Sequence, residues 1–92
     1  MKINIEYSKK SIKFIKKNTD ILNIETVKKL ILKSLQWILY NQIINIDLKQ
    51  LKGKEDNLYR IRKGNIRIIF KVQKGQIIIV SIKTIGYRGN VY

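Results

Sequence analysis

Cysteine, histidine and proline are all absent from the 92 residues of the sequence. Without cysteine, the chain has no disulfide, no thiolate nucleophile and no cysteine-based metal site. Without histidine, it lacks the commonest general base and the usual nitrogen ligand of transition metals. These absences predict that the protein uses neither a metal nor another cofactor.

Long apolar runs are absent as well. The longest uninterrupted aliphatic run covers residues 77–80, whereas a membrane-spanning helix needs roughly 18 apolar residues. The first six residues lack the apolar segment of a signal peptide. We therefore expect a cytoplasmic protein with no membrane partner.

Acidic residues are scarce, because six Asp and Glu oppose 20 Lys and Arg and leave a formal net charge of +14. The hydrophobic fraction of 45% is sufficient for a folded core. A chain of this length forms a single domain, residues 1–92. The surplus of positive charge predicts a partner rich in negative charge, such as a nucleic acid or an acidic protein.

The first half of the chain predicts one strand and two helices. Residues 2–7 alternate between apolar and polar side chains, as a short strand does. Ser8 is suited to cap a helix that ends near residue 18, and a second helix runs from about residue 25 to about residue 41. Apolar residues of the second segment recur at the helical period, at Val27, Leu30, Ile31, Leu35, Ile38 and Leu39.

The second half predicts a sheet. Residues 42–57 have no clear period, but 58–62, 66–72 and 77–82 are rich in β-forming residues and are separated by glycine-containing turns. Two glycines within residues 85–92 predict a turn or bulge before a last short strand. The fold class is therefore α+β: an N-terminal strand, a helical hairpin, and an antiparallel meander of three to four strands with the helices packed on one sheet face.

The arginines are not spread evenly. All six acids lie before residue 57, and the stretch from 57 to 92 holds four Lys and all four Arg. These arginines are Arg60, Arg62, Arg67 and Arg88. Because the chain uses lysine everywhere else, four clustered arginines indicate a need for the guanidinium group, which binds phosphate in two-point geometry.

The register of the first hairpin sharpens this interpretation. A two-residue loop at 63–64 would set Arg60 directly opposite Arg67, with Arg62 beside them on the same face. Like charges that face each other across strands destabilise a sheet, and no acid is near in sequence to neutralise them. Such a face predicts a bound anion. A three-residue loop would instead place Arg67 on the face of Ile61.

The aromatic residues fall into two groups. Tyr59 alternates with apolar neighbours and is expected in the core, and Trp37 on the second helix is expected to serve packing. Tyr87 and Tyr92 flank Arg88 in a glycine-rich end without acids. Aromatic side chains beside a cation can stack on nucleic-acid bases, so we predict this role for both.

Three spaced elements of the second half resemble the RelE/ParE superfamily of bacterial toxins. They are a leucine-glycine turn at 51–53, a hairpin reading Leu-Tyr-Arg-Ile-Arg-Lys-Gly-Asn-Ile-Arg at 58–67, and an end reading Gly-Tyr-Arg-Gly-Asn-Val-Tyr at 86–92. The preceding strand and helical hairpin agree with the superfamily in order and length. The resemblance implies a small toxin that is neutralised by an acidic antitoxin protein.

The resemblance also implies a reaction. RelE-like members cleave mRNA on the ribosome without a metal, by attack of a ribose 2′-OH on the adjacent phosphate. By this resemblance, Arg67 clamps the scissile phosphate, Arg88 lies near the leaving oxygen, and Tyr92 stacks on a base and orients the nucleophile. Arg60 and Arg62 fall where relatives carry basic residues, so these five residues form the predicted catalytic set.

The chain departs from the family at two points. Arginine is a poor general base, so the proton must pass to Tyr92, to Lys63, to the loop of Lys52 and Lys54, or to solvent. Tyr87 stands at a position that is usually basic in the family. We predict that the side chains of Lys52, Lys54, Lys63 and Tyr87 contact RNA.

Three functions remain open from the sequence. The first is a ribosome-dependent endoribonuclease, or mRNA interferase. The second is a ParE-like inhibitor of DNA gyrase without nuclease activity, which would agree with the two departures. The third is an RNA-binding protein, or a toxin that has lost its activity. In either toxin interpretation we expect an acidic antitoxin along the exposed helix and the basic sheet, bound less tightly as salt is added.

Overall fold

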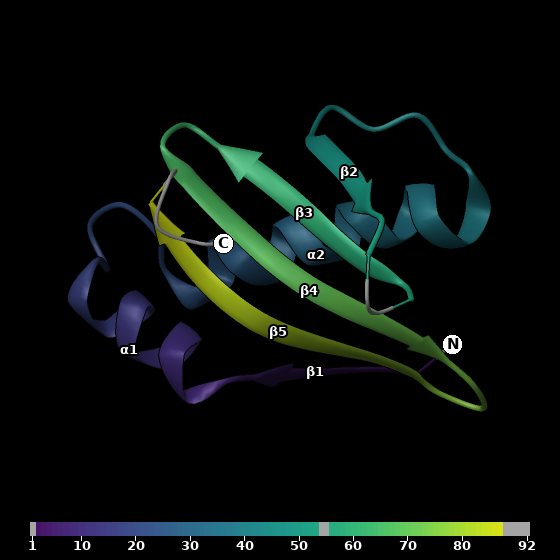
Figure 1. The fold of residues 1–92 in the computed structure, drawn as a ribbon, viewed down its shortest axis with the longest axis horizontal. Helices are drawn as coiled ribbons and strands as arrows, with labels where there is room; N and C mark the ends of the chain where they lie inside the picture. Colours follow the sequence, from purple (N-terminus) through teal and green to yellow (C-terminus); the bar gives the residue numbers. More distant parts are fainter. Residues whose placement is uncertain (1, 54–55, 88–92) are drawn as a thin grey trace.

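A mixed five-stranded sheet with two helices on one face forms the protein (Figure 1). The computed structural model describes residues 2–53 and 56–87. The elements are β1 (Ile3–Tyr7), α1 (Lys9–Lys17), α2 (Ile24–Tyr40), β2 (Asp47–Leu51), β3 (Leu58–Lys63), β4 (Ile66–Lys74) and β5 (Ile78–Tyr87). The strand order is β1-β5-β4-β3-β2. This confirms the predicted α+β class.

The sheet is not a pure meander. Strands β3, β4 and β5 follow one another as antiparallel neighbours, as expected, and β2 pairs antiparallel with β3. The N-terminal strand β1 instead pairs parallel with β5, the last strand of the chain. A parallel pair requires a long connection between the strands, which here is the rest of the domain. The first and last strands of the described chain are therefore neighbours, with Ile3 beside Ile78 and Tyr7 beside Ile82.

Both predicted helices are confirmed, and side-chain caps explain where they begin. The Ser8 hydroxyl accepts a hydrogen bond from the Ser11 backbone N–H at 3.1 Å, and Asn23 Oδ1 accepts one from the Thr26 N–H at 2.9 Å. Asn41 ends α2 in the left-handed conformation, with φ of 55°. Within the described ranges, neither helix is both long and apolar enough to span a membrane.

The helices cover one face of the sheet, and α2 crosses behind β3 and β4 in Figure 1. Val27, Ile31 and Leu35 of α2 are buried with the inward side chains of the central strands, among them Ile61 and Phe70. Because side chains alternate along a strand, the residues between these point to the other side of the sheet. We call that side the open face.

Strand β2 was not predicted. Residues 47–51 read Asp-Leu-Lys-Gln-Leu, and only Leu48 and Leu51 are partly buried. The segment is an edge strand, paired with β3 alone. An edge strand can be short and polar because one of its sides faces solvent. Its extended form therefore depends on pairing with β3 and leaves little trace in the sequence.

The sequence predicted a turn or bulge and a last short strand within residues 85–92, and the structure describes only the beginning of that segment. Strand β5 runs without interruption to Tyr87, and Gly86 lies inside it, opposite Arg67. The irregularity lies earlier, where Ile69 and Phe70 pair with Thr84 and Ile82 and leave Lys83 as the extra residue of β5. Residues 88–92 lie outside the described ranges.

Candidate functional site

The turn between β3 and β4 decides which arginines meet. Lys63 pairs with Ile66, so the two-residue loop is Gly64 and Asn65, one position later than predicted. Gly64 has a φ of 57°, a conformation that favours glycine and suits the first position of such a loop. The preference of this conformation for glycine explains the position of the loop.

The new register corrects the predicted pairing but keeps the predicted face. Arg62, not Arg60, lies directly opposite Arg67, and Arg60 pairs with Ile69. The shift amounts to two residues in the pairing, and side chains alternate with a period of two. Arg60, Arg62 and Arg67 therefore still share the open face.

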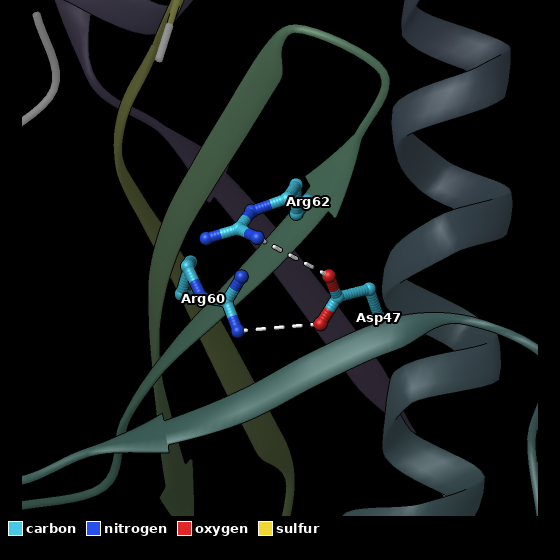
Figure 2. Close-up of polar contacts among 3 residues, drawn as sticks. All are labelled: Asp47, Arg60 and Arg62. Carbon is cyan, nitrogen blue, oxygen red and sulfur yellow. Dashed lines mark hydrogen bonds and ion pairs between the residues drawn. The ribbon is translucent and has the colours of Figure 1, made fainter. Parts of the chain in front are cut away.

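Asp47 on β2 compensates two of these arginines, which the sequence analysis did not foresee. Its Oδ1 accepts a hydrogen bond from Arg60 Nη2 at 3.3 Å, and its Oδ2 lies 3.9 Å from Arg62 Nη1. Figure 2 shows the carboxylate reaching from β2 toward both guanidinium groups. The prediction that no acid neutralises the arginines was wrong, because Asp47 pairs with Arg62 in the β2–β3 ladder.

The described charged side chains of this part of the open face sum to a positive formal charge. Within residues 2–53 and 56–87, Asp47 forms the only ion pairs, and its single charge faces Arg60 and Arg62, with Arg67 opposite Arg62. Lys49 lies on the same face, opposite Arg60. We call Asp47, Arg60, Arg62 and Arg67 the arginine cluster. Its net charge suits an anionic ligand.

Arg60 is the most buried member of the cluster. Its side chain is 7% exposed, against 52% for Asp47. Its Nη1 is buried and has no hydrogen-bond partner among the described residues. A buried guanidinium with an unsatisfied N–H destabilises a fold. Residues that destabilise the fold in this way are typical of binding or catalytic sites, so the burial of Arg60 supports a functional role for the cluster.

Two predicted RNA-binding residues lie away from the arginine cluster. Lys63 and Tyr87 both pair with Ile66, so their side chains point to the helix side of the sheet. The Tyr87 hydroxyl donates a hydrogen bond to Asn18 Oδ1 at 2.7 Å. Its ring packs edge-to-face on the Phe14 ring, with the ring centroids 5.3 Å apart. The structure thus places Tyr87 against α1, and its predicted contact with RNA stays a prediction.

Lys52 lies at the opposite end of the β2–β3 pair from Asp47. It is exposed in the loop after β2, whose last residue, Leu51, pairs with Leu58 at the start of β3. Arg60 and Arg62 lie two and four residues further along β3, which corresponds to about 7 Å and about 13 Å at the usual rise per residue. The predicted residues Lys54, Arg88 and Tyr92 lie outside the described ranges. The structure therefore assembles three of the nine predicted site residues.

The arginine cluster can bind and stabilise a phosphate. A guanidinium keeps its charge when partly buried and presents N–H groups in a planar fork that matches phosphate oxygens. The described open face offers no histidine or cysteine, since the chain has none. Its chemistry is therefore mainly electrostatic, and the one side chain of the arginine cluster that can accept a proton, the Asp47 carboxylate, is ion-paired with Arg60 and Arg62.

Asp47 was missed because nothing in its local sequence signals a site. Its role is visible only when β2 is paired with β3. We expect Asp47→Asn to lower the free energy of unfolding by about 1–2 kcal/mol, because the buried Arg60 charge loses its partner. Urea unfolding monitored by circular dichroism measures this loss.

The matched control is Asp20→Asn, which removes an exposed carboxylate that forms no ion pair within the described ranges. A second substitution, Arg60→Met in the Asp47→Asn chain, should restore stability by removing the unpaired charge. Equal stability of Asp47→Asn and the wild type would show that the pair does not hold Arg60.

Comparison by sequence finds no matching family model and no matching curated protein. Comparison by structure finds several solved proteins of the same fold. A copper-bound mutant toxin from Helicobacter pylori matches with a TM-score of 0.64 at 15% identity, over 97% of this chain and 98% of that one. The YoeB dimer from Staphylococcus aureus matches with 0.62 at 21%, over 96% and 99%. The YoeB/ParE toxin from Agrobacterium tumefaciens matches with 0.61 at 12%, over 92% and 98%.

These neighbours define the class of the fold, which is that of small bacterial toxins. More specifically, the chain has the fold of RelE/ParE-type toxin structures along nearly its whole length. The resemblance seen in the sequence is thus confirmed at the level of the fold.

Proposed function

We propose that this chain is the toxin of a type II toxin–antitoxin system and cleaves mRNA on the ribosome. The observation that carries the proposal is the arginine cluster on the open face of a RelE/ParE-type fold. A surface of guanidinium groups with one carboxylate fits a phosphodiester better than it fits a neutral ligand. Metal-free cleavage of RNA needs positioning and charge stabilisation above all.

The proposed reaction forms one bond and breaks one. The ribose 2′-oxygen bonds to the adjacent phosphorus while its proton passes to Tyr92 or to water. The 5′-oxygen of the next nucleotide leaves with a proton, so the products are a 2′,3′-cyclic phosphate and a 5′-hydroxyl end. Arg67 binds the phosphoryl oxygens, which gain negative charge in the transition state, and Arg88 assists the leaving oxygen.

In this proposal Asp47 is a positioning residue. Its two oxygens hold Arg60 and Arg62 at fixed places on β3. Fixed donors stabilise developing charge better than mobile ones, because they need no reorganisation during the reaction. In the proposed reaction, Arg60 and Arg62 on β3 and Arg67 on β4 together stabilise the charge of the phosphate.

A second candidate function is inhibition of DNA gyrase without nuclease activity. One observation favours it: Lys63, one of the expected proton acceptors, points to the opposite side of the sheet from the arginine cluster. The one carboxylate of the cluster, Asp47, is ion-paired with Arg60 and Arg62, and a cluster whose carboxylate is engaged in this way is better suited to bind phosphate than to cleave it.

Expression of the chain in bacteria, followed by primer extension on several mRNAs, tests the proposal. We expect new 5′ ends inside coding regions within minutes of induction. In parallel, purified protein is added to a gyrase supercoiling assay, where we expect no inhibition. Growth arrest with intact mRNA and blocked supercoiling would overturn the ribonuclease proposal in favour of the gyrase inhibitor.

An antitoxin is the partner that this proposal requires. Apolar surface at the end of α2 supports a protein partner, because Trp37 and Ile43 are 38% and 99% exposed. They line a hollow together with Ile44, Ile46 and Leu48. A partner segment with apolar side chains would cover this surface, and acidic residues in it would compensate the arginine cluster.

A further inference from the structure

Helix α1 carries five lysines on one side. They are Lys9, Lys10, Lys13, Lys16 and Lys17, and all are exposed. At 3.6 residues per turn they fall within an arc of about 120°. The buried residues of the helix, Ser11 and Ile15, point the other way. We call these five residues the lysine face of α1.

Composition does not account for this face. Sixteen lysines among 92 residues correspond to fewer than two in a segment of nine, whereas α1 has five. The helix has no acid, and within the described part of the chain none of the five lysines forms an ion pair. The face is thus a local concentration of uncompensated charge.

Part of the arrangement opposes helix stability. Lys16 and Lys17 lie in the last turn, where the helix dipole favours cations, but Lys9 and Lys10 occupy the first turn, where it favours acids and no acid is present. Lys13 is four residues from both Lys9 and Lys17, and like charges at this spacing repel. Local rules broken without compensation inside the fold are typical of a binding surface.

The lysine face is separate from the arginine cluster. Helix α1 packs beside β5 on the helix-covered side, and β2, which carries Asp47, forms the far edge of the sheet (Figure 1). Lys9, Lys13 and Lys16 line a hollow of about 350 Å³ with Tyr7 and Ile12. Burial, and then the nearby Glu25, raise the pKa of Tyr7, so its hydroxyl remains a hydrogen-bond donor.

The chemistry of the face favours a nucleic-acid backbone over a protein. All exposed residues of α1 are lysines, since Ile15 is buried and both Ile12 and Phe14 are partly buried. A protein partner needs apolar area, and that area lies at the end of α2. Lysines act as mobile point charges that bind phosphates without reading sequence.

We infer that the lysine face of α1 binds the phosphate backbone of a second RNA segment, distinct from the strand at the arginine cluster. The inference rests on the proposed function in that both require an RNA partner. It assigns the two basic surfaces different tasks: the arginines hold the cleaved strand, and the lysines hold structured RNA next to it. Both surfaces can be occupied together, because they lie on opposite sides of the sheet.

Binding of a short fluorescent RNA hairpin to the purified full-length chain tests this inference. The test variant replaces three lysines that line the hollow, by Lys9→Gln, Lys13→Gln and Lys16→Gln. Losing three phosphate contacts to the duplex stem should reduce the slope of log K against log salt by about 2.7, and lower affinity about 500-fold near 0.1 M salt. Glutamine has a helix propensity close to that of lysine, so the fold should persist.

The matched control removes the same charge from the exposed side of α2, by Lys28→Gln, Lys29→Gln and Lys33→Gln. We expect it to change the slope little and the affinity less than about threefold. Equal losses of affinity in the two triple variants would overturn the inference, because they would indicate that the net charge of the protein alone determines RNA binding. Tighter binding of polyglutamate than of RNA at the lysine face would also overturn it, in favour of an acidic protein partner.

Failure of this inference is distinguishable from failure of the proposed function. Arg67→Ala should abolish cleavage but retain the binding of the hairpin through α1. If cells show no RNA cleavage while the triple variant of α1 has a reduced slope of log K against log salt, the inference about the lysine face is supported and the ribonuclease proposal is rejected. If cleavage occurs while the α1 variant binds like the wild type, only the inference is lost.

Discussion

Replacing Arg67 by alanine is expected to lower the rate of RNA cleavage by about 10²–10³-fold, as removal of one fixed transition-state donor does in other enzymes. Arg67 lies on β4, a central strand, and is half-buried opposite Arg62. Its guanidinium is therefore held by the rigid part of the sheet. Single-turnover cleavage of ribosome-bound mRNA measures the effect on the chemical step alone.

Two further variants make this prediction specific. Arg67→Lys keeps the charge but loses the planar fork, so we expect a rate between those of the wild type and Arg67→Ala. Lys71→Ala changes a cation on the same strand and the same face, four residues away, and should cleave nearly as fast as the wild type. Full activity of Arg67→Ala would remove Arg67 from the reaction.

Replacing Phe70 by alanine is expected to reduce the free energy of unfolding by about 3–5 kcal/mol. Phe70 is fully buried, and its ring stacks on that of Tyr59 at a centroid distance of 5.7 Å. Total stability of a small domain is about 5–15 kcal/mol. The variant should therefore be partly or wholly unfolded at growth temperature, as thermal denaturation followed by circular dichroism would show.

Phe70→Leu keeps most of the apolar volume and should cost less than about 1.5 kcal/mol, so it provides a folded reference. Phe14→Ala is the second control. Phe14 is only partly buried, at the edge where α1 meets Tyr87, and its loss should have a smaller effect. A Phe70→Ala chain with wild-type stability would contradict the assignment of Phe70 to the centre of the core.

The two predictions concern Arg67 and Phe70, which lie on the same strand, β4, but on opposite faces of the sheet. Along β4, Ile68 and Phe70 point to the helices while Arg67 and Ile69 point to the open face. Because the arginines are not part of the core, the open face can carry repelling charges without disturbing the packing of α2. The same alternation allows substitutions on the open face to change activity while the fold remains.

Local patterns in the sequence predicted most of the elements. The Ser8 cap, the apolar stripe of α2 and the β-rich runs after residue 57 depend on neighbours within a few positions, so they can be recognised without a structure. The face shared by Arg60, Arg62 and Arg67 was also predicted, although the loop was placed one residue too early. It survived because both loops have two residues, which preserves the alternation of sides.

Long-range pairing decided the rest. The sequence by itself determined the helices, the central hairpin, the concentration of positive charge and the side of the sheet that carries three arginines. Only the tertiary structure decided that β1 joins β5, that Asp47 on an unpredicted edge strand compensates Arg60 and Arg62, and that Tyr87 packs against α1. The physical reason is that periodicity and capping act between near neighbours, whereas an edge strand and an ion pair depend on which distant segments the fold brings together.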